Sequence, residues 1–243
     1  MPLAIDLFCG LGGWTDGLLA EGYDVIGFDI TRHEYGEHRY PAQLVIQDVM
    51  TLHGSQFKDA ALIVASPPCQ AYSYRAMPWS KARALPPPDN TLFESCFRIQ
   101  REACEAAGRH IPLIVENVRG AQKWVGRARW NYGSFYLWGD VPALMPVTYQ
   151  GIKNPGYPRW NNFVDKGEVS KSWTIESIKR DCIKQNREVL NKDGHNVIIP
   201  QVVFQGSKSN GRKMASAMIA KIPLPLSRYI AATFRPQLAE AAE

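Results

Sequence analysis

The chain has 243 residues, of which 45% are hydrophobic, and a formal net charge of +5. This length suits one domain with a small insert. No run of about 18 apolar residues is present, so we expect no transmembrane helix, and the early apolar run at Leu3 leaves no room for a signal peptide. Five cysteines without CxxC spacing and five histidines without a cluster predict reduced thiols, a cytoplasmic location and no metal site.

The first 118 residues alternate strand-like and helix-like segments, which predicts a doubly wound α/β fold. The expected strands are Ala4–Phe8, Asp24–Asp29, Leu44–Gln47, Leu62–Ala65 and 113–115. A glycine-rich turn at residues 10–13 is expected to begin a helix that ends at Ala20. An amphipathic helix is expected over residues 92–107, with Gly108 as its stop. The proline-rich residues 71–90 before it predict a loop that covers the substrate.

The alternation weakens after residue 145, where prolines and glycines interrupt any long element. We therefore predict a small irregular region at residues 149–211. Helical patterns at Met214–Ala220 and Pro225–Phe234 return the chain to the first domain, which then comprises residues 1–148 and 212–236. Residues 237–243 are expected to be a frayed tail.

The excess of positive over negative charge is confined to one segment. Residues 151–213 hold 12 Lys+Arg against 6 Asp+Glu, whereas the rest of the chain holds 16 against 17. The same segment carries Tyr157, Trp160, Phe163 and Trp173. Basic residues interleaved with aromatic ones suit a nucleic-acid surface, and a solvated lysine-rich face is the alternative that composition alone leaves open.

The N-terminal motif Asp6-Leu7-Phe8-Cys9-Gly10-Leu11-Gly12-Gly13 joins a strand to a helix start. Glycines let the backbone approach a ligand closely, although many such turns only pack tightly. Asp29, at the end of the second strand, fits a ribose diol. Asp48, after the third strand, fits an adenine amino group. Together these features predict a pocket for a nucleoside cofactor.

A second motif, Ser66-Pro67-Pro68-Cys69-Gln70, places a cysteine on a loop stiffened by two prolines at the end of a buried strand. Glu116 and Asn117 end the next strand, and parallel strands end at the same edge of a sheet. A thiol and a carboxylate near a nucleoside pocket predict covalent catalysis on an electrophilic ring. The alternatives are a structural buried cysteine and a Glu116 that pairs with Arg119 or Arg127.

The chain resembles the DNA cytosine-5 methyltransferases, in a compact, phage-like form. The residues that carry the resemblance are Asp6–Gly13, Ser66–Gln70, Asn90–Phe93 and Val115–Gly120. The resemblance implies a Rossmann-like, S-adenosylmethionine-dependent methyltransferase fold that acts on double-stranded DNA as a monomer. Residues 149–211 would then be the target-recognition region.

The resemblance also implies a set of catalytic residues. The target cytosine flips out of the duplex, the thiol of Cys69 adds to its C6, and C5 then takes the methyl group. Glu116 hydrogen-bonds N3 and the exocyclic amine, and Gln70 and Asn117 complete the catalytic motifs. An arginine of the strand-like segment Arg127-Ala128-Arg129 binds O2.

The residues expected to bind the cofactor come from both ends of the chain. They are Asp6, Phe8, Gly10, Gly12, Gly13, Asp29, Ile30, Asp48, Val49, Pro68, Leu92 and Lys221.

The sequence departs from the family pattern in three places. The recognition region is short. Gly126-Arg127-Ala128-Arg129 lacks the glutamine that the family places two residues before the first arginine, which leaves open the alternative that either arginine contacts phosphate and not the base. The late Gly-Asn-Ala-Val-Pro motif appears as Ile219-Ala220-Lys221-Ile222-Pro223.

The lysine in this late motif has three interpretations. Lys221 turns to solvent or to a neighbouring acid, or it pairs with the carboxylate of the cofactor's amino-acid part. In the third, it pairs with an extra carboxylate on a carboxy-S-adenosylmethionine donor, and the enzyme installs a carboxymethyl group.

Two further functions compete with DNA modification. One is an RNA cytosine-5 methyltransferase, which shares the fold and the motifs. The other is a non-catalytic DNA-binding protein, against which the intact Cys69, Gln70, Glu116 and Asn117 argue.

Overall fold

The computed structural model describes residues 1–72, 86–145, 189–190, 196–197, 213–214, 217–218 and 220–236. The chain divides into two compact units, one of Met1–Ile152 with Lys221–Glu243 and one of Lys153–Ala220. In the second unit, β8 (Val189–Leu190) pairs with β9 (Asn196–Val197) in antiparallel orientation. The rest of the expected recognition region, most of the expected substrate-covering loop and the tail lie outside the described residues. The domain boundaries therefore stay predictions.

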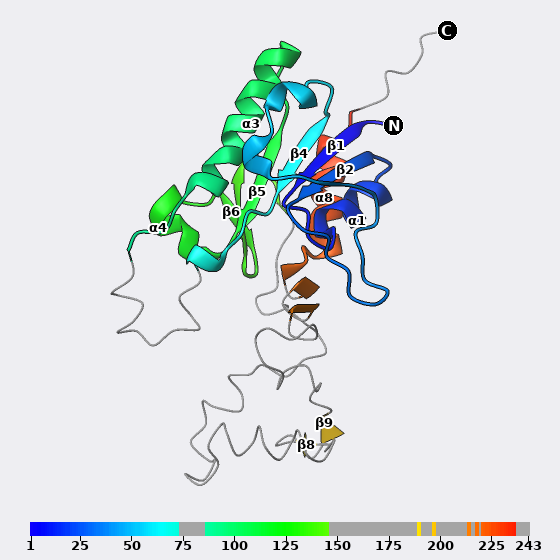
Figure 1. The fold of residues 1–243 in the computed structure, drawn as a ribbon, viewed down its shortest axis with the longest axis vertical. Helices are drawn as coiled ribbons and strands as arrows, with labels where there is room; N and C mark the ends of the chain where they lie inside the picture. Colours follow the sequence, from blue (N-terminus) through cyan, green and yellow to red (C-terminus); the bar gives the residue numbers. More distant parts are fainter. Residues whose placement is uncertain are drawn as a thin grey trace. The chain divides into compact units, whose positions relative to one another are not determined.

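A seven-stranded sheet with the order β3-β2-β1-β4-β5-β7-β6 forms the centre of the first unit (Figure 1). Its strands are β1 (Leu3–Leu7), β2 (Asp24–Asp29), β3 (Gln43–Ile46), β4 (Leu62–Ala65), β5 (Leu113–Asn117), β6 (Trp130–Tyr132) and β7 (Phe135–Gly139). The strands from β3 to β5 are parallel, and β7 runs antiparallel to both β5 and β6. The doubly wound α/β architecture is confirmed.

The strand order reverses between β1 and β4. The chain adds β2 and β3 on one side of β1, then returns to place β4 and β5 on the other side. In open α/β sheets, ligands bind beyond the carboxyl ends of the strands at such a reversal. This edge is therefore where the topology places a site.

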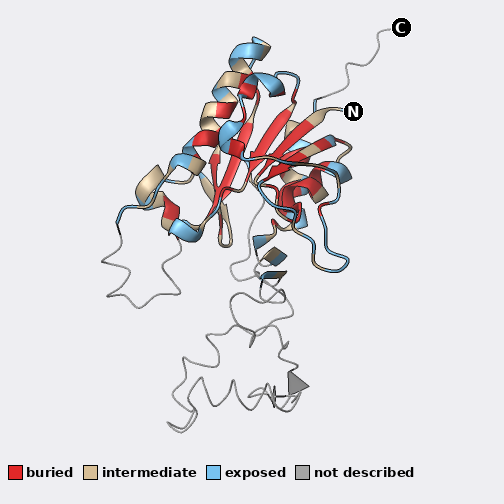
Figure 2. Ribbon diagram, in the orientation of Figure 1, coloured by how far each residue is buried: buried red, intermediate tan, exposed pale blue. Residues whose placement is uncertain are grey.

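Helices cover both faces of the sheet. Helices α1 (Gly13–Ala20) and α8 (Leu224–Phe234) pack on one face, and α3 (Thr91–Ala107) packs on the other. Side chains along a strand point alternately to the two faces, and β4 shows this directly. Leu62 and Val64 join the core under α1 and α8, whereas Ile63 joins the core under α3. Figure 2 accordingly shows the central strands as buried between the helices.

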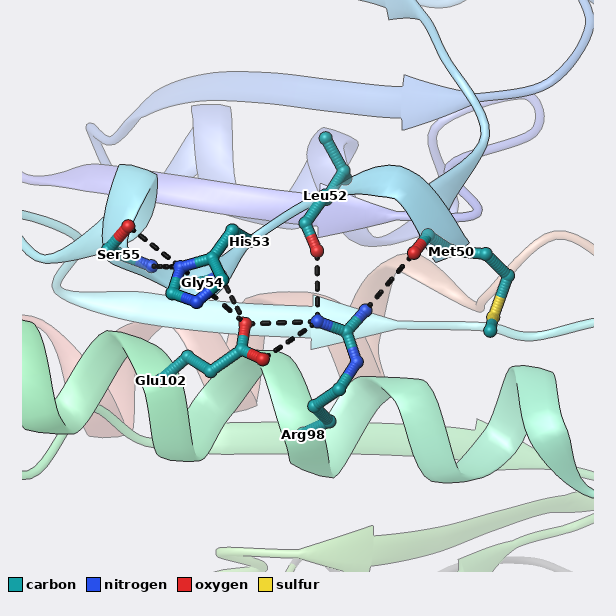
Figure 3. Close-up of polar contacts among 7 residues, drawn as sticks. All are labelled: Met50, Leu52, His53, Gly54, Ser55, Arg98 and Glu102. Carbon is teal, nitrogen blue, oxygen red and sulfur yellow. Dashed lines mark hydrogen bonds and ion pairs between the residues drawn. The ribbon is translucent and has the colours of Figure 1, made fainter.

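A polar network ties α3 to the connection between β3 and β4, which contains the 3-10 turns η1 (Val49–Thr51) and η2 (Gly54–Phe57) (Figure 3). The backbone N–H of Gly54 donates to Glu102 Oε2 at 2.6 Å. Arg98 Nη1 donates to Glu102 Oε1 at 2.9 Å and to the carbonyl of Leu52 at 3.0 Å. A Cβ at Gly54 would lie 2.0 Å from the carbonyl oxygen of Ile99. Only glycine at position 54 lets this connection lie so close to α3, and the network holds the two segments together.

Differences from the sequence analysis concern element ends and the last two strands. β1 and β3 each begin and end one residue earlier than expected, and β5 extends to Asn117. The hairpin of β6 and β7 was not predicted. The segment Arg127–Arg129 precedes β6, which begins at Trp130, and the chain bends at Arg129.

Two absences hold for the residues that the structure describes. Within them, no helix is long and apolar enough to cross a membrane. The same residues contain no group of three or more His, Cys, Asp or Glu side chains that could hold a metal ion.

Candidate active site

The glycine loop, which we define as residues 8–13, joins β1 to α1 at the edge where the strand order reverses. Phe8, Gly10 and Gly12 have φ values of +57°, +51° and +74°. A Cβ at Gly12 would lie 2.5 Å from Cδ of Pro41. A Cβ at Gly10 would meet nothing within 4 Å. The loop is therefore packed tightly at Gly12 and open at Gly10, where a ligand can approach the backbone.

Asp29 ends β2 next to this loop. It is 8% exposed, and its carboxylate accepts the N–H of Gly10 at 3.0 Å and that of Thr31 at 3.1 Å. His33 Nε2 lies 3.5 Å from the same group. Burial raises the pKa of Asp29, but the hydrogen bonds from His33, Gly10 and Thr31 outweigh burial and hold it below its ordinary value. Asp29 is thus an anion fixed against the glycine loop.

The other residues expected to contact the adenosine follow the ends of β2 and β3. Ile30 is 67% exposed, an unusual position for a large apolar side chain, whereas Val49 is buried. Asp48 caps η1 by accepting the N–H of Met50 at 2.9 Å, and its side chain is exposed. An exposed apolar face and an accessible carboxylate are what an adenine ring and its amino group require.

Asp6 belongs to a buried network that the sequence did not reveal. Its Oδ2 accepts the hydroxyl of Thr15 at 2.7 Å, and that hydroxyl lies 2.7 Å from the hydroxyl of Tyr40. Among the described residues, Oδ1 of Asp6 has no hydrogen-bond partner. Burial raises the pKa of Asp6 to about 7. The network joins β1, α1 and the segment before β3 directly beneath the glycine loop.

The nucleophile loop, residues 66–72, follows β4 and is braced from several sides. The indole N–H of Trp14 in α1 donates to Ser66 Oγ at 3.0 Å. The N–H of Tyr72 donates to the carbonyl of Cys69 at 3.0 Å. A Cβ at Gly120 would lie 2.2 Å from the carbonyl oxygen of Tyr72, so the segment after β5 presses directly on the loop. The half-buried thiol of Cys69 is thus carried by a fixed backbone.

Glu116 and Asn117 end β5 beside this loop. The register pairs Ala65, the last residue of β4, with Val115 of β5. β5 continues for two more residues to Asn117, so its end runs beside the start of the nucleophile loop. The amide of Asn117 donates to the carbonyl of Pro67 at 3.0 Å in a buried hydrogen bond. Glu116 is 9% exposed. The structure therefore brings the cysteine loop and the glutamate to one edge, and it makes Asn117 the residue that positions the loop.

Arg127 and Arg129 are both exposed. The backbone around them is fixed, because the N–H of Arg129 donates to the carbonyl of Leu137 at 2.9 Å and that of Ala128 to Gln122 Oε1 at 3.2 Å. Neither arginine is singled out as the one that binds the base, and that assignment stays a prediction.

The late motif, residues 219–223, returns to the glycine loop at Ile222. A Cβ at Gly13 would lie 2.3 Å from the backbone nitrogen of Ile222. Lys221 Nζ lies 2.7 Å from Asp16 Oδ2 in the first turn of α1. This ion pair supports the interpretation in which Lys221 turns to a neighbouring acid. Of the remaining expected contacts, Leu92 is half-buried at the start of α3, and Pro68 is exposed.

This sheet order, with a glycine loop after β1 and an acid at the end of β2, defines the class of Rossmann-like methyltransferase folds. Within that class the comparison with family models is decisive. The model of the C-5 cytosine-specific DNA methylases matches residues 3–128, which is more than half of the chain. The chain belongs to this family.

Comparison with solved structures gives distant matches. A putative DNA modification methyltransferase encoded within an E. coli prophage is 25% identical, with a TM-score of 0.37, and the match covers 51% of this chain and 34% of that one. A DNMT2 mutant of Spodoptera frugiperda is 19% identical over 51% of this chain and 38% of that chain, with a TM-score of 0.35.

A third match is the methyltransferase EhMeth of Entamoeba histolytica, which is 16% identical with a TM-score of 0.40. That match covers 62% of this chain and 57% of the other. The match to the prophage-encoded protein spans only about a third of that protein's length, 34%. No curated protein matches the sequence.

Proposed function

We propose that the protein transfers a methyl group from S-adenosylmethionine to C5 of cytosine in double-stranded DNA. The observation that carries this proposal is the buried hydrogen bond from Asn117 to Pro67, which joins the cysteine loop to the strand end that holds Glu116. The indole of Trp14 ties the same loop to the helix that follows the glycine loop. Nucleophile, acid and cofactor motifs of the family thus meet at one sheet edge.

The residues present fit S-adenosylmethionine. The space above Gly10 admits the ligand, Asp29 accepts the ribose hydroxyls and the exposed Ile30 packs on the adenine. Asp48 accepts the adenine amino group. The remaining residues of the proposed pocket are Phe8, Gly12, Gly13, Val49, Pro68, Leu92 and Lys221. Asp6 supports the glycine loop from beneath through its hydrogen bond with Thr15. The cofactor supplies an electrophilic methyl group.

The protein residues make C5 of cytosine nucleophilic. Flipping the base out of the duplex costs about a few kcal/mol. The thiolate of Cys69 then forms a bond to C6, while Glu116 donates a hydrogen bond to N3 and accepts one from the exocyclic amine. Because Glu116 is almost fully buried, its interaction with the ring is little screened by water. After the methyl group has passed to C5, a water molecule takes the C5 proton, and the bond between C6 and sulfur breaks to return the thiolate of Cys69.

Two neighbouring groups assist this step in the proposal. Arg127 or Arg129 donates a hydrogen bond to O2 of cytosine. This bond stabilises the negative charge that O2 gains when the thiolate adds to the ring. Gln70, exposed next to the cysteine, faces the part of the duplex that the flipped base has left. Asn117 acts through the loop backbone and does not touch the base.

The ion pair of Lys221 with Asp16 favours the methyl donor over a carboxymethyl donor. The ammonium group already has a carboxylate partner at 2.7 Å, so Asp16 compensates its charge and a second carboxylate on the donor would gain less from it. We therefore expect carboxy-S-adenosylmethionine to be the poorer donor.

Mass spectrometry of nucleosides from a bacterial host that expresses the protein tests this function. The DNA is expected to contain 5-methylcytosine with the wild type and none with Cys69→Ala or Glu116→Gln. Carboxymethylcytosine in the DNA would overturn the donor assignment. Modified cytosine confined to RNA would establish the RNA enzyme, and no modification at all would leave a non-catalytic DNA-binding protein.

A further inference from the structure

A strip of positive charge follows the glutamate motif. Residues 117–139 contain no aspartate or glutamate but contain Arg119, Lys123, Arg127 and Arg129, which we call the basic strip. All four side chains are exposed. In the part of the chain that the structure describes, none of the four forms an ion pair. The strip therefore carries four charges that no described carboxylate neutralises.

The packing of this segment points the basic strip away from the core. Ala121 is fully buried, and Trp124, Val125 and Ala128 pack against the core under α3. Ala128, between the two arginines, is half-buried, whereas Arg127 and Arg129 are both exposed. Both arginines are therefore open to solvent.

The backbone of the basic strip is fixed to the catalytic edge. Gly120 presses on the nucleophile loop, as described above, and Asn90 Nδ2 donates to the carbonyl of Trp124 at 3.4 Å. The indole N–H of Trp138 in β7 donates to the carbonyl of Gly126 at 2.9 Å. Figure 1 shows α4 (Gln122–Val125) near the N-terminal end of α3, consistent with the contact from Asn90. The backbone of the basic strip is thus held in place, and its first part lies against the nucleophile loop that carries Cys69.

The four like charges of the basic strip repel one another unless an anion binds there. A DNA strand suits the basic strip, because its successive phosphates can each meet a separate cation without rearrangement of the protein. Lys123 also lies over the ring of Trp124, at 4.4 Å from its centroid, and this contact reduces the freedom that the lysine would lose on binding a phosphate.

We propose that Arg119 and Lys123, with the arginine of the pair Arg127 and Arg129 that does not reach the base, bind the phosphates next to the flipped cytosine. This inference rests on the proposed function. The basic strip holds the strand backbone in place while the base leaves the stack, so it contributes to DNA affinity rather than to the chemical step.

The dependence of DNA affinity on salt tests the basic strip, because each neutralised phosphate contributes about −0.9 to the slope of log K against log[salt]. Removal of two phosphate contacts in Arg119→Ala/Lys123→Ala should make this slope about 1.8 less steep. Between about 50 and 200 mM salt, the wild type should lose roughly 12-fold more affinity than the variant does. A fluorescein-labelled duplex and fluorescence anisotropy provide the measurement.

The double variant Lys58→Ala/Arg101→Ala is the matched control. It removes the same charge from two exposed positions outside the basic strip, the end of η2 and the middle of α3, and should keep the wild-type slope. The charge-conserving Arg119→Lys/Lys123→Arg should keep that slope too. Titration with S-adenosylhomocysteine should give the same affinity in all four proteins, which shows that the variants are folded.

The two proposals fail in different ways. A wild-type protein that neither binds nor modifies DNA overturns the proposed function and the basic strip with it. Suppose instead that the wild type modifies DNA and that Arg119→Ala/Lys123→Ala has the same slope as the wild type. This result overturns only the proposal that the basic strip binds phosphates. An equal change of slope in the Lys58/Arg101 control also overturns it, because the effect would then follow net charge and not position.

Discussion

Replacement of Asp6 by asparagine should change how the stability of the protein depends on pH. The side chain is 1% exposed, and burial raises its pKa from 3.8 to about 7. Each pKa unit corresponds to about 1.4 kcal/mol, so the difference between the folded and unfolded chains amounts to roughly 4 kcal/mol. This value is large beside the stability of a typical domain.

The sign follows from the direction of the pKa change. At low pH the carboxyl is protonated in both states. As the pH rises from about 4 to about 7, the unfolded chain releases this proton first, so the free energy of unfolding falls by roughly 4 kcal/mol and then stays constant. The side-chain amide of the Asp6→Asn variant has no such proton to release, yet its oxygen still offers Thr15 an acceptor.

Urea denaturation at a series of pH values measures this effect. The difference in unfolding free energy between the wild type and Asp6→Asn should change by roughly 4 kcal/mol between about pH 4 and pH 8, in favour of the variant at high pH. The control Asp59→Asn makes the same substitution at an exposed position and shows how much of the change is specific to the buried carboxyl. A constant offset for Asp6→Asn would refute the assignment of a protonated carboxyl at Asp6.

Three further predictions concern other contacts of the site. Asn117→Ala should lower the rate of the chemical step in single-turnover assays and destabilise the fold by about 1–3 kcal/mol, with S-adenosylhomocysteine affinity unchanged; an unaltered rate would show that the loop positions itself. Gly13→Ala should lower the thermal midpoint, because its Cβ would lie 2.3 Å from the backbone of Ile222, whereas Gly36→Ala, whose Cβ would meet nothing within 4 Å, should lower it less. The hydrogen bond with Asp29 raises the pKa of His33, and the protonated ring competes with ribose for that carboxylate. Wild-type affinity for S-adenosylhomocysteine should therefore fall as His33 gains its proton, and calorimetry should show less dependence on pH in His33→Asn; identical profiles would contradict the competition.

The parallel part of the sheet was predictable because each strand leaves a local signal. The run Leu62–Ala65 is apolar throughout, as buried parallel strands are, and glycines mark the turn into α1. The relation between Cys69 and Glu116 followed from topology alone, since adjacent parallel strands end at one edge. The strand β6 was missed because it has only three residues, and the five-residue β7 was missed although it is as long as β1.

The contacts that brace the site could not be predicted, because they join segments that are distant in sequence. Thr15 and Tyr40 are 25 residues apart, and no local pattern marks either as a partner of Asp6. Likewise, the sequence left three interpretations of Lys221 open, because only the folded chain shows that Asp16 is within reach. His33 follows Asp29 by four residues, a spacing that carries no signal outside a helix.

The packing of α1 on α8 determines when, during translation, the domain can assemble. The hydroxyl of Tyr23 donates to the carbonyl of Ala231 at 3.0 Å, across 208 residues of sequence, and Gly17 allows Ser227 to approach in the same interface. A nascent chain therefore presents the glycine loop to solvent long before the ribosome has made the helix that covers α1. Until then Trp14 and Leu18 have only the sheet to pack against and lack their contacts with α8. This core can therefore be completed only when most of the chain has been synthesised.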